Sequence, residues 1–180
     1  HSIVNVFSEL VMKRFFLLFL ACLFFLNCGY HLLGTGTLLP PYIKKMNIPM
    51  FKNLTTRFEL DFKLTQSVID EIVARVKVKI IGNMESADAV LFGEIIGFSV
   101  IPIAFSREAT ADRYNITIVA KIIMKDMVSR KIIFSNPNFQ YMEEYEVPEG
   151  VDFETVETEA LDKVGVKFAR SLVSTILEGF

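Results

Sequence analysis

Histidine and cysteine are scarce in this chain, and both are confined to its beginning. Two of the 180 residues are histidine, His1 and His31, and two are cysteine, Cys22 and Cys28. A Ser-His-Asp triad, a Cys-His pair and a His-rich zinc site all need side chains that residues 32–180 do not contain. These classes of catalytic and metal site are therefore excluded for most of the chain.

The chain also lacks an excess of charge of either sign. Its 19 lysines and arginines stand against 21 aspartates and glutamates, and no long basic run occurs. A nucleic-acid binder that neutralises phosphates needs such an excess, so we expect no nucleic-acid partner. Repeats and low-complexity tracts are absent too, and the length suits one domain.

Neither a phosphate-binding loop nor a catalytic carboxylate pair stands out among the remaining residues. The segment "GTGT" lacks the lysine and the helix that follow a phosphate loop, and Gly93 and Gly97 fall inside a predicted strand. The carboxylates gather in "MEEYEVPEG" and "FETVETEALD", where they suit a charged loop and a helix start. We expect a protein that is not an enzyme and holds no cofactor or metal; a carboxylate acid-base pair is the alternative.

A single long hydrophobic run lies near the beginning of the chain. It covers Phe15–Leu26, 12 residues, and follows the basic pair Lys13 and Arg14. Spanning a bilayer takes about 20 helical residues, so the run is typical of a signal peptide. Extended through "NCGYHLL" it would reach the length of a signal anchor, which is the alternative.

Cys28 follows the apolar run at the position where a bacterial lipoprotein signal places the cysteine that receives the lipid. A thiol is a nucleophile to which a diacylglyceryl group can be attached, and each buried CH₂ of the acyl chains then contributes about 0.8 kcal/mol to anchoring. Cys22 is interpreted as an apolar residue of the signal. Phe25 and Asn27 depart from the residues usual before a lipidated cysteine, so an unmodified Cys28 thiol is the alternative.

Three regions follow from this interpretation. Residues 1–27 are upstream residues and a lipoprotein signal peptide that is removed, with the signal counted from Met12. Residues 28–41 are the lipidated N-terminus and a flexible tether, which the Gly- and Pro-rich "GTGTLLPPY" favours. Residues 42–180 form a single domain.

Hydrophobic periodicity predicts the elements of that domain. A first helix starts near Thr55 or Thr56 and carries an apolar stripe of Phe58, Phe62, Thr65, Val68, Ile69, Ile72, Val73 and Val76. A second helix covers residues 151–177 and carries an apolar stripe of Phe153, Val156, Ala160, Leu161, Val164, Phe168, Leu172, Val173 and Ile176. Strands are predicted over residues 42–51, 76–80, 87–105, 113–126 and 131–147, and the third of them bends or bulges near Gly93 or Gly97.

The predicted order indicates an α+β fold with two helices packed on one face of a mostly antiparallel four-stranded sheet. Between Tyr114 and Lys125 apolar residues alternate strictly, which indicates one buried face and one partly wet face. The second face is more apolar than solvent contact requires, and a partner surface is expected there. Its apolar residues are Ile101, Ile103, Phe105, Val119 and Ile123.

Four segments of the chain, in order, resemble the LptE family of lipopolysaccharide-assembly lipoproteins. They are "CGYHLLG", "PMFKNLTTRFEL", "ADAVLFGEI" and an Arg-containing turn before "DRYNITI", and the resemblance covers Cys28 to Phe180. It implies two helices on one side of a four-stranded sheet. It also implies a non-enzymatic outer-membrane lipoprotein that plugs the LptD β-barrel, helps that barrel assemble, and binds lipopolysaccharide on its way to the outer leaflet.

The resemblance also implies particular site residues. Cys28 would carry the lipid, and Gly29 behind it lacks the aspartate that retains lipoproteins at the inner membrane, so we expect an anchored protein on the periplasmic side of the outer membrane. Basic residues would contact lipopolysaccharide, because a guanidinium offers phosphate a bidentate donor fork. The candidates are Arg107, Lys121, Lys125, Arg130 and Lys131, each of which would otherwise be a solvated surface charge.

A different class of function stays open alongside the barrel plug. The chain could be an unrelated periplasmic lipoprotein that binds a small ligand or acts as a hydrolase. A deep concave pocket with converging polar groups would favour that hypothesis, whereas an apolar outer sheet face favours the plug.

Overall fold

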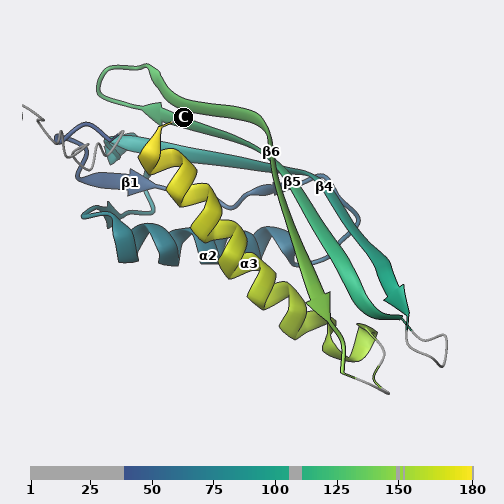
Figure 1. Cartoon of the computed structure of the whole chain (residues 1–180). Helices are drawn as coiled ribbons and strands as arrows, with labels where there is room; N and C mark the ends of the chain where they lie inside the picture. The colour runs from purple at the N-terminus through teal and green to yellow at the C-terminus, as the bar shows by residue number, and fades with distance from the viewer. Residues whose placement is uncertain (1–38, 106–110, 149–150, 152, 180) are drawn as a thin grey trace, which may run out of the picture. The chain divides into compact units, whose positions relative to one another are not determined.

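A computed structural model describes residues 39–105, 111–148, 151 and 153–179 of the chain. In this part of the chain a sheet of six strands is joined by two α-helices and one short 3₁₀ helix (Figure 1). The elements are β1 (Lys45–Asn47), β2 (Lys52–Asn53), α2 (Leu60–Arg75), β3 (Lys79–Ile80), η1 (Met84–Ser86), β4 (Ala89–Phe105), β5 (Ala111–Asp126), β6 (Ile132–Glu146) and α3 (Phe153–Glu178).

The sheet is mixed, with the strand order β3-β1-β4-β5-β6 and with β2 beside β4. The long strands β4, β5 and β6 are antiparallel, whereas β1 is parallel to both β3 and β4, and β2 is parallel to β4. The predicted α+β class with two helices is confirmed. The prediction of a mostly antiparallel four-stranded sheet is wrong for the short strands.

Two physical features account for that difference. Pro49 has no backbone N–H, so the strand predicted over residues 42–51 is divided into β1 and β2. The helix α2 lies between these strands and β3, and strands joined through a helical crossover pair in parallel. The alternating pattern of a short strand indicates its existence but carries no information on its direction.

Both helices cover the same face of the sheet, which is named the inner face (Figure 1). The strict alternation along β5 is confirmed, because its inner residues are buried while Lys121 on the opposite, outer face is exposed. At one end of the core the rings of Tyr114 and Phe153 stack with centroids 4.6 Å apart. The buried inner residues of β5 are Ile116, Ile118, Ala120, Ile122 and Met124.

The helix α2 begins five residues after Thr55, and neither Thr55 nor Thr56 caps it. The Thr55 backbone N–H and hydroxyl both donate to Asn53 Oδ1, at 2.9 and 2.7 Å, which holds this threonine in the preceding turn. Glu59 then enters the helix from the left-handed region, at φ 59°. A local side-chain turn thus outcompetes the capping role that the sequence suggested.

The buried stripe of α2 also differs from the predicted one. Leu60, Leu64, Thr65, Val68 and Ile72 face the core, whereas the predicted core residues Phe58, Phe62 and Val73 are exposed. Once the helix starts at Leu60, the leucines at successive turns form the stripe, and the phenylalanines lie outside it. The stripe predicted for α3 is confirmed at nearly every position, from Phe153 to Ile176.

Gly93 lies where β4 passes under a buried aromatic ring. A Cβ atom built on Gly93 would lie 2.5 Å from ring carbons of Phe51, which is 1% exposed. The Phe51 backbone N–H donates to Thr65 Oγ1 at 2.9 Å, so the ring is held between β4 and α2. Of the two glycines named for a bend or bulge, Gly97 lies at a register shift between β4 and β5, which falls between Ile95 and Gly97.

Replacing Gly93 by alanine should therefore destabilise the domain. The added methyl group would force the Phe51 ring out of its packed position, which should lower the free energy of unfolding by about 1–3 kcal/mol. Gly82→Ala is the matched control, because nothing lies within 4 Å of its added Cβ. Urea denaturation of both variants measures the difference, and equal midpoints would contradict the role given to Gly93.

Asp126 closes the turn between β5 and β6 and joins it to the start of the domain. Its carboxylate is 1% exposed and accepts from the backbone N–H groups of Val128 and Ser129 at 2.8 and 3.0 Å. The hydroxyls of Ser129 and Tyr42 donate to its other oxygen. Burial raises the pKa of Asp126, but these hydrogen bonds outweigh burial and lower the pKa to about 2 from its ordinary 3.8.

Asp126→Asn should destabilise the domain in a pH-dependent manner. Because the pKa of Asp126 is lower in the folded chain than in the unfolded chain, its ionised form stabilises the fold above about pH 4, and this contribution is lost as the pH falls toward 2. We expect a loss of about 1–3 kcal/mol at pH 7 that shrinks on acidification. Chemical denaturation between pH 2.5 and 7 measures it, with Glu178→Gln as an exposed control; a loss independent of pH would refute the assignment.

Candidate functional site

The outer face of β4, β5 and β6 has no helix over it among the described residues. Its apolar side chains include Phe92, Ile101 and Met142, which pair across the strands with the outer residues Ile123, Asn115 and Thr117. The last residues of β4 continue this exposed apolar surface. The outer patch is defined here as Phe92, Ile101, Ile103, Phe105 and Met142, all of which are exposed.

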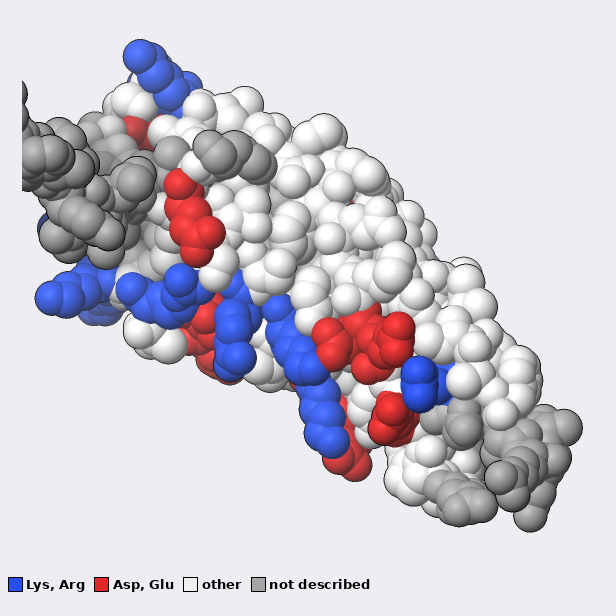
Figure 2. Space-filling model, in the orientation of Figure 1, with Lys and Arg blue, Asp and Glu red and all other residues white. Residues whose placement is uncertain are grey.

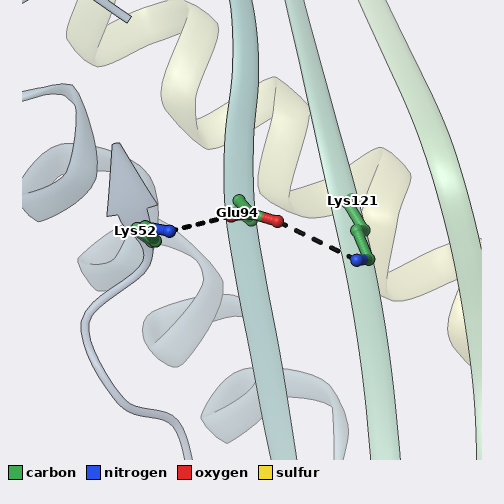
Figure 3. Close-up of polar contacts among 3 residues, drawn as sticks. All are labelled: Lys52, Glu94 and Lys121. Carbon is green, nitrogen blue, oxygen red and sulfur yellow. Dashed lines mark hydrogen bonds and ion pairs between the residues drawn. The ribbon is translucent and has the colours of Figure 1, made fainter. Parts of the chain in front are cut away.

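One ion network crosses the outer face (Figure 3). Glu94 on β4 pairs with Lys52 on β2 at 3.3 Å and with Lys121 on β5 at 4.0 Å. The three residues are direct cross-strand neighbours, because Glu94 stands opposite Lys52 on one side and Lys121 on the other. Two cations therefore share one carboxylate, and the trio carries one net positive charge.

The described candidates for lipopolysaccharide contact lie along β5 and in the connection that follows it. Lys121 and Lys125 lie on the outer face of β5, about 13 Å apart at the usual rise of a strand. Arg130 and Lys131 are exposed in the connection between β5 and β6, which is at the end of β5 opposite to Ala111. Arg107 and Cys28 lie outside the described residues. The structure thus places Lys121 and Lys125 on one face, and Arg130 and Lys131 lie beyond its Lys125 end, where the Asp126 backbone N–H donates to the Lys131 carbonyl at 2.8 Å.

A cavity of about 520 Å³ opens beside the start of α2. Phe58 and Phe62 line it with exposed fractions of 82% and 59%, together with Met50. Arg57 in its wall pairs with Glu157 of α3 at 2.8 Å, and its Nε atom is buried without a hydrogen-bond partner among the described residues. The periodicity of the sequence places both phenylalanines in the core, and they are exposed because α2 begins only at Leu60.

A groove of about 320 Å³ separates α3 from β6. The helix contributes three cations, Lys163, Lys167 and Arg170, and β6 contributes Glu143, Glu144 and Tyr145. In Figure 2 charged side chains of both signs gather over the helices, whereas the middle of the strands is almost free of them. The sequence shows Lys163 and Lys167 on the polar side of a helix, but it does not show that β6 would face them.

Hydrogen bonds fix the carboxylate wall of this groove. Glu143 accepts from Lys167 and from the Tyr141 hydroxyl, the latter at 2.7 Å, and these bonds lower the pKa of Glu143 despite its partial burial. Burial and the neighbouring Glu143 carboxylate raise the pKa of Tyr141. Lys163 pairs with Glu159 at 2.7 Å, and its Nζ lies 5.7 Å from the centroid of the Tyr145 ring. The groove is thus charged but largely neutralised by its own pairs.

The described residues contain no cluster of three or more histidine, cysteine or acidic side chains arranged to hold a metal ion. Of the helices in the described ranges, none combines the length and the apolar character needed to cross a membrane.

Comparisons with known proteins bear on the fold. No protein-family model matches the sequence, and a search of curated proteins finds no match either. An uncharacterized lipoprotein B from Nitrosomonas europaea aligns in structure over 77% of this chain and 84% of its own, with a TM-score of 0.51 and 10% identity.

A second solved structure, of a protein from Xanthomonas campestris, aligns over 76% of this chain and 88% of its own, with a TM-score of 0.52 and 10% identity. At this level of identity the likeness concerns the fold and nothing further. The chain therefore has a fold that is also found in a bacterial lipoprotein.

Proposed function

We propose that this chain is an LptE-like outer-membrane lipoprotein, held on the periplasmic side by a lipid on Cys28. In this role it plugs an LptD-like β-barrel, assists the assembly of that barrel and contacts lipopolysaccharide during transport, without acting as an enzyme. The ordered sequence segments from "CGYHLLG" to "DRYNITI" support the proposal, and so does a fold that is shared with a lipoprotein.

The observation that carries the proposal is the apolar outer patch. Contiguous apolar surface on a protein marks a site of interaction when it exceeds a few hundred Å². In the middle of the outer face Lys52 and Lys121 share the Glu94 carboxylate, so a partner that covers this part buries an ion network rather than a single charge, whereas Lys125 would need an anion from the partner or ligand. A large protein partner that encloses the strands fits this combination of apolar and internally paired side chains.

Lipopolysaccharide contact through the outer face rests on Lys121 and Lys125. Lys121 shares Glu94 with Lys52, whereas Lys125 has no ion pair among the described residues. A phosphate group could therefore approach Lys125 most readily. Arg107 keeps its predicted role as a phosphate contact.

The cavity at Phe58 and Phe62 favours a second candidate function, the binding of a small apolar ligand by a periplasmic lipoprotein. Its volume of about 520 Å³ lies within the range of ligand sites. Native mass spectrometry of the protein purified from cells separates the two functions, since a small ligand would add a discrete mass and a barrel would co-purify as a large subunit.

Ile101→Glu should abolish co-purification of the β-barrel from outer membranes. Ile101 is 56% exposed, so the glutamate stays solvated in the isolated domain and its stability should change by less than about 1 kcal/mol. In a complex the same carboxylate would be buried without a partner.

Val73→Glu is the matched control, because Val73 on α2 is also 56% exposed and lies away from the outer patch. This variant should retain the barrel. Equal recovery of the barrel with both variants would exclude the outer patch as the contact surface.

The mature N-terminus should be a lipidated Cys28. Removal of residues 1–27 and addition of acyl chains predict a defined mass, and Cys28→Ala should release the chain from the membrane fraction because the anchor is lost. Mass spectrometry of the protein from membranes checks this, and a cysteine without lipid at this position would rule out the proposed anchor.

A further inference from the structure

The groove between α3 and β6 combines cations with apolar surface in one place. Lys163, Lys167 and Arg170 follow each other at intervals of four and three residues, so they project from successive turns of one side of α3. β6 is the last strand of the sheet among the described residues. The row of cations therefore runs beside an edge strand rather than beside another covered strand.

The three cations differ in how far they are neutralised. Lys163 pairs with Glu159, and Lys167 pairs with Glu143. Arg170 is exposed and makes no ion pair with any residue that the structure describes. An anion entering the groove would thus find a guanidinium available and the ammonium of Lys167 one helical turn away.

The apolar part of the groove lies between these cations. Val166 is 48% exposed on the same stretch of α3, Val164 lies buried beneath it, and the Tyr145 ring faces them from β6. An alkyl chain laid on Val166 would gain apolar contact, and at the Tyr145 ring it would lie beside the Lys163 ammonium, whose Nζ is 5.7 Å from the ring centroid. The ligand that suits both halves of the lining is an amphiphile.

The carboxylates of the groove favour a single phosphate group over an acidic peptide as the bound anion. Glu143 and Glu144 line the same wall, so an extended acidic peptide would bring several charges close to them. A single compact phosphate can sit at Arg170 with its charge concentrated there, and a guanidinium binds phosphate through two parallel N–H donors.

We propose that the groove between α3 and β6 binds a phosphorylated amphiphile, with the phosphate at Arg170 and Lys167 and an alkyl chain over Val166 and Tyr145. The volume of about 320 Å³ accommodates a phosphate and part of one chain rather than a whole lipid. This site is distinct from Lys121 and Lys125 on the outer face. Its ligand class is inferred from the groove itself, and only the choice of lipopolysaccharide as the natural ligand rests on the proposed function.

The test is binding of the full chain to purified lipopolysaccharide, to dephosphorylated lipopolysaccharide, and to phosphatidylglycerol and phosphatidylcholine vesicles. Arg170→Gln should weaken binding of the phosphorylated probes about fivefold or more, as expected for a lost charge-assisted contact. Lys79→Gln removes an exposed cation of β3 and should leave binding unchanged. Dephosphorylated lipopolysaccharide and phosphatidylcholine should bind weakly to every variant.

Two further variants test the charged half and the apolar half of the groove, and they should change the affinity in opposite directions. Glu143→Gln should strengthen binding of the phosphorylated probes, because it releases Lys167 from its carboxylate. Val166→Ser should weaken binding of lipopolysaccharide without changing the response to inorganic phosphate, which lacks an alkyl chain.

The outcomes separate this inference from the proposed function. If Arg170→Gln binds lipopolysaccharide as tightly as the unmodified chain while the double variant Lys121→Gln, Lys125→Gln does not, the groove is refuted and the proposed function stands. If the unmodified chain binds phosphatidylglycerol through Arg170 but ignores lipopolysaccharide, the groove stands and lipopolysaccharide contact fails. If the unmodified chain binds none of the phosphorylated probes, both the groove site and the proposed contact with lipopolysaccharide are overturned.

Discussion

The pairing of three long antiparallel strands is the constraint on which the rest of this structure depends. β4, β5 and β6 hold 17, 16 and 15 residues, and β5 pairs with both neighbours over almost its whole length. Because side chains alternate along a strand, this pairing commits every second residue to one face. Covering that face with α2 and α3 removes the apolar residues of β5 from water and leaves the other face to a different use.

The short strands and the helices are arranged around that constraint. β1 and β2 add to the edge of β4 in parallel. The Phe51 ring packs against Gly93, and the Phe51 backbone N–H donates to Thr65 Oγ1, which joins α2 to this edge. The ion pair between Arg57 and Glu157 and the hydrogen bond from Arg75 to Ser174 join α2 to α3 near both ends of α2. The two helices consequently run in the same direction across the inner face.

Sequence periodicity predicts the long elements here because each imposes a repeated pattern on many residues. The alternation from Tyr114 to Lys125 and the stripe of α3 are read correctly, since a one-residue error would place a whole apolar face in water. Short elements carry too little pattern: Pro49 indicates a strand end, but nothing nearby predicts that β1 pairs in parallel. Helical spacing places Phe58 and Phe62 in the core, because spacing alone does not reveal where a helix begins.

The candidate surfaces were harder to predict than the fold, for a related reason. A lysine or arginine in a sequence gives no sign of a partner on another element. Lys121 pairs with Glu94 of the neighbouring strand, and Lys167 of α3 pairs with Glu143 of β6. The groove between α3 and β6 exists because β6 lies beside the helix, and that position follows from the order of the strands in the sheet. Spacing within one segment cannot express a contact between two segments.

The sheet also determines which functions can operate together. The outer patch and the groove of α3 lie on opposite sides of the same strands, because α3 packs on the inner face and its polar side meets the edge at β6. A protein that encloses the outer face therefore does not have to occupy the groove, and a ligand in the groove does not have to leave when that partner binds. Binding of an amphiphile at Arg170 and contact of a barrel at Ile101 should then be nearly independent, with a coupling free energy close to zero unless the partner also reaches around β6.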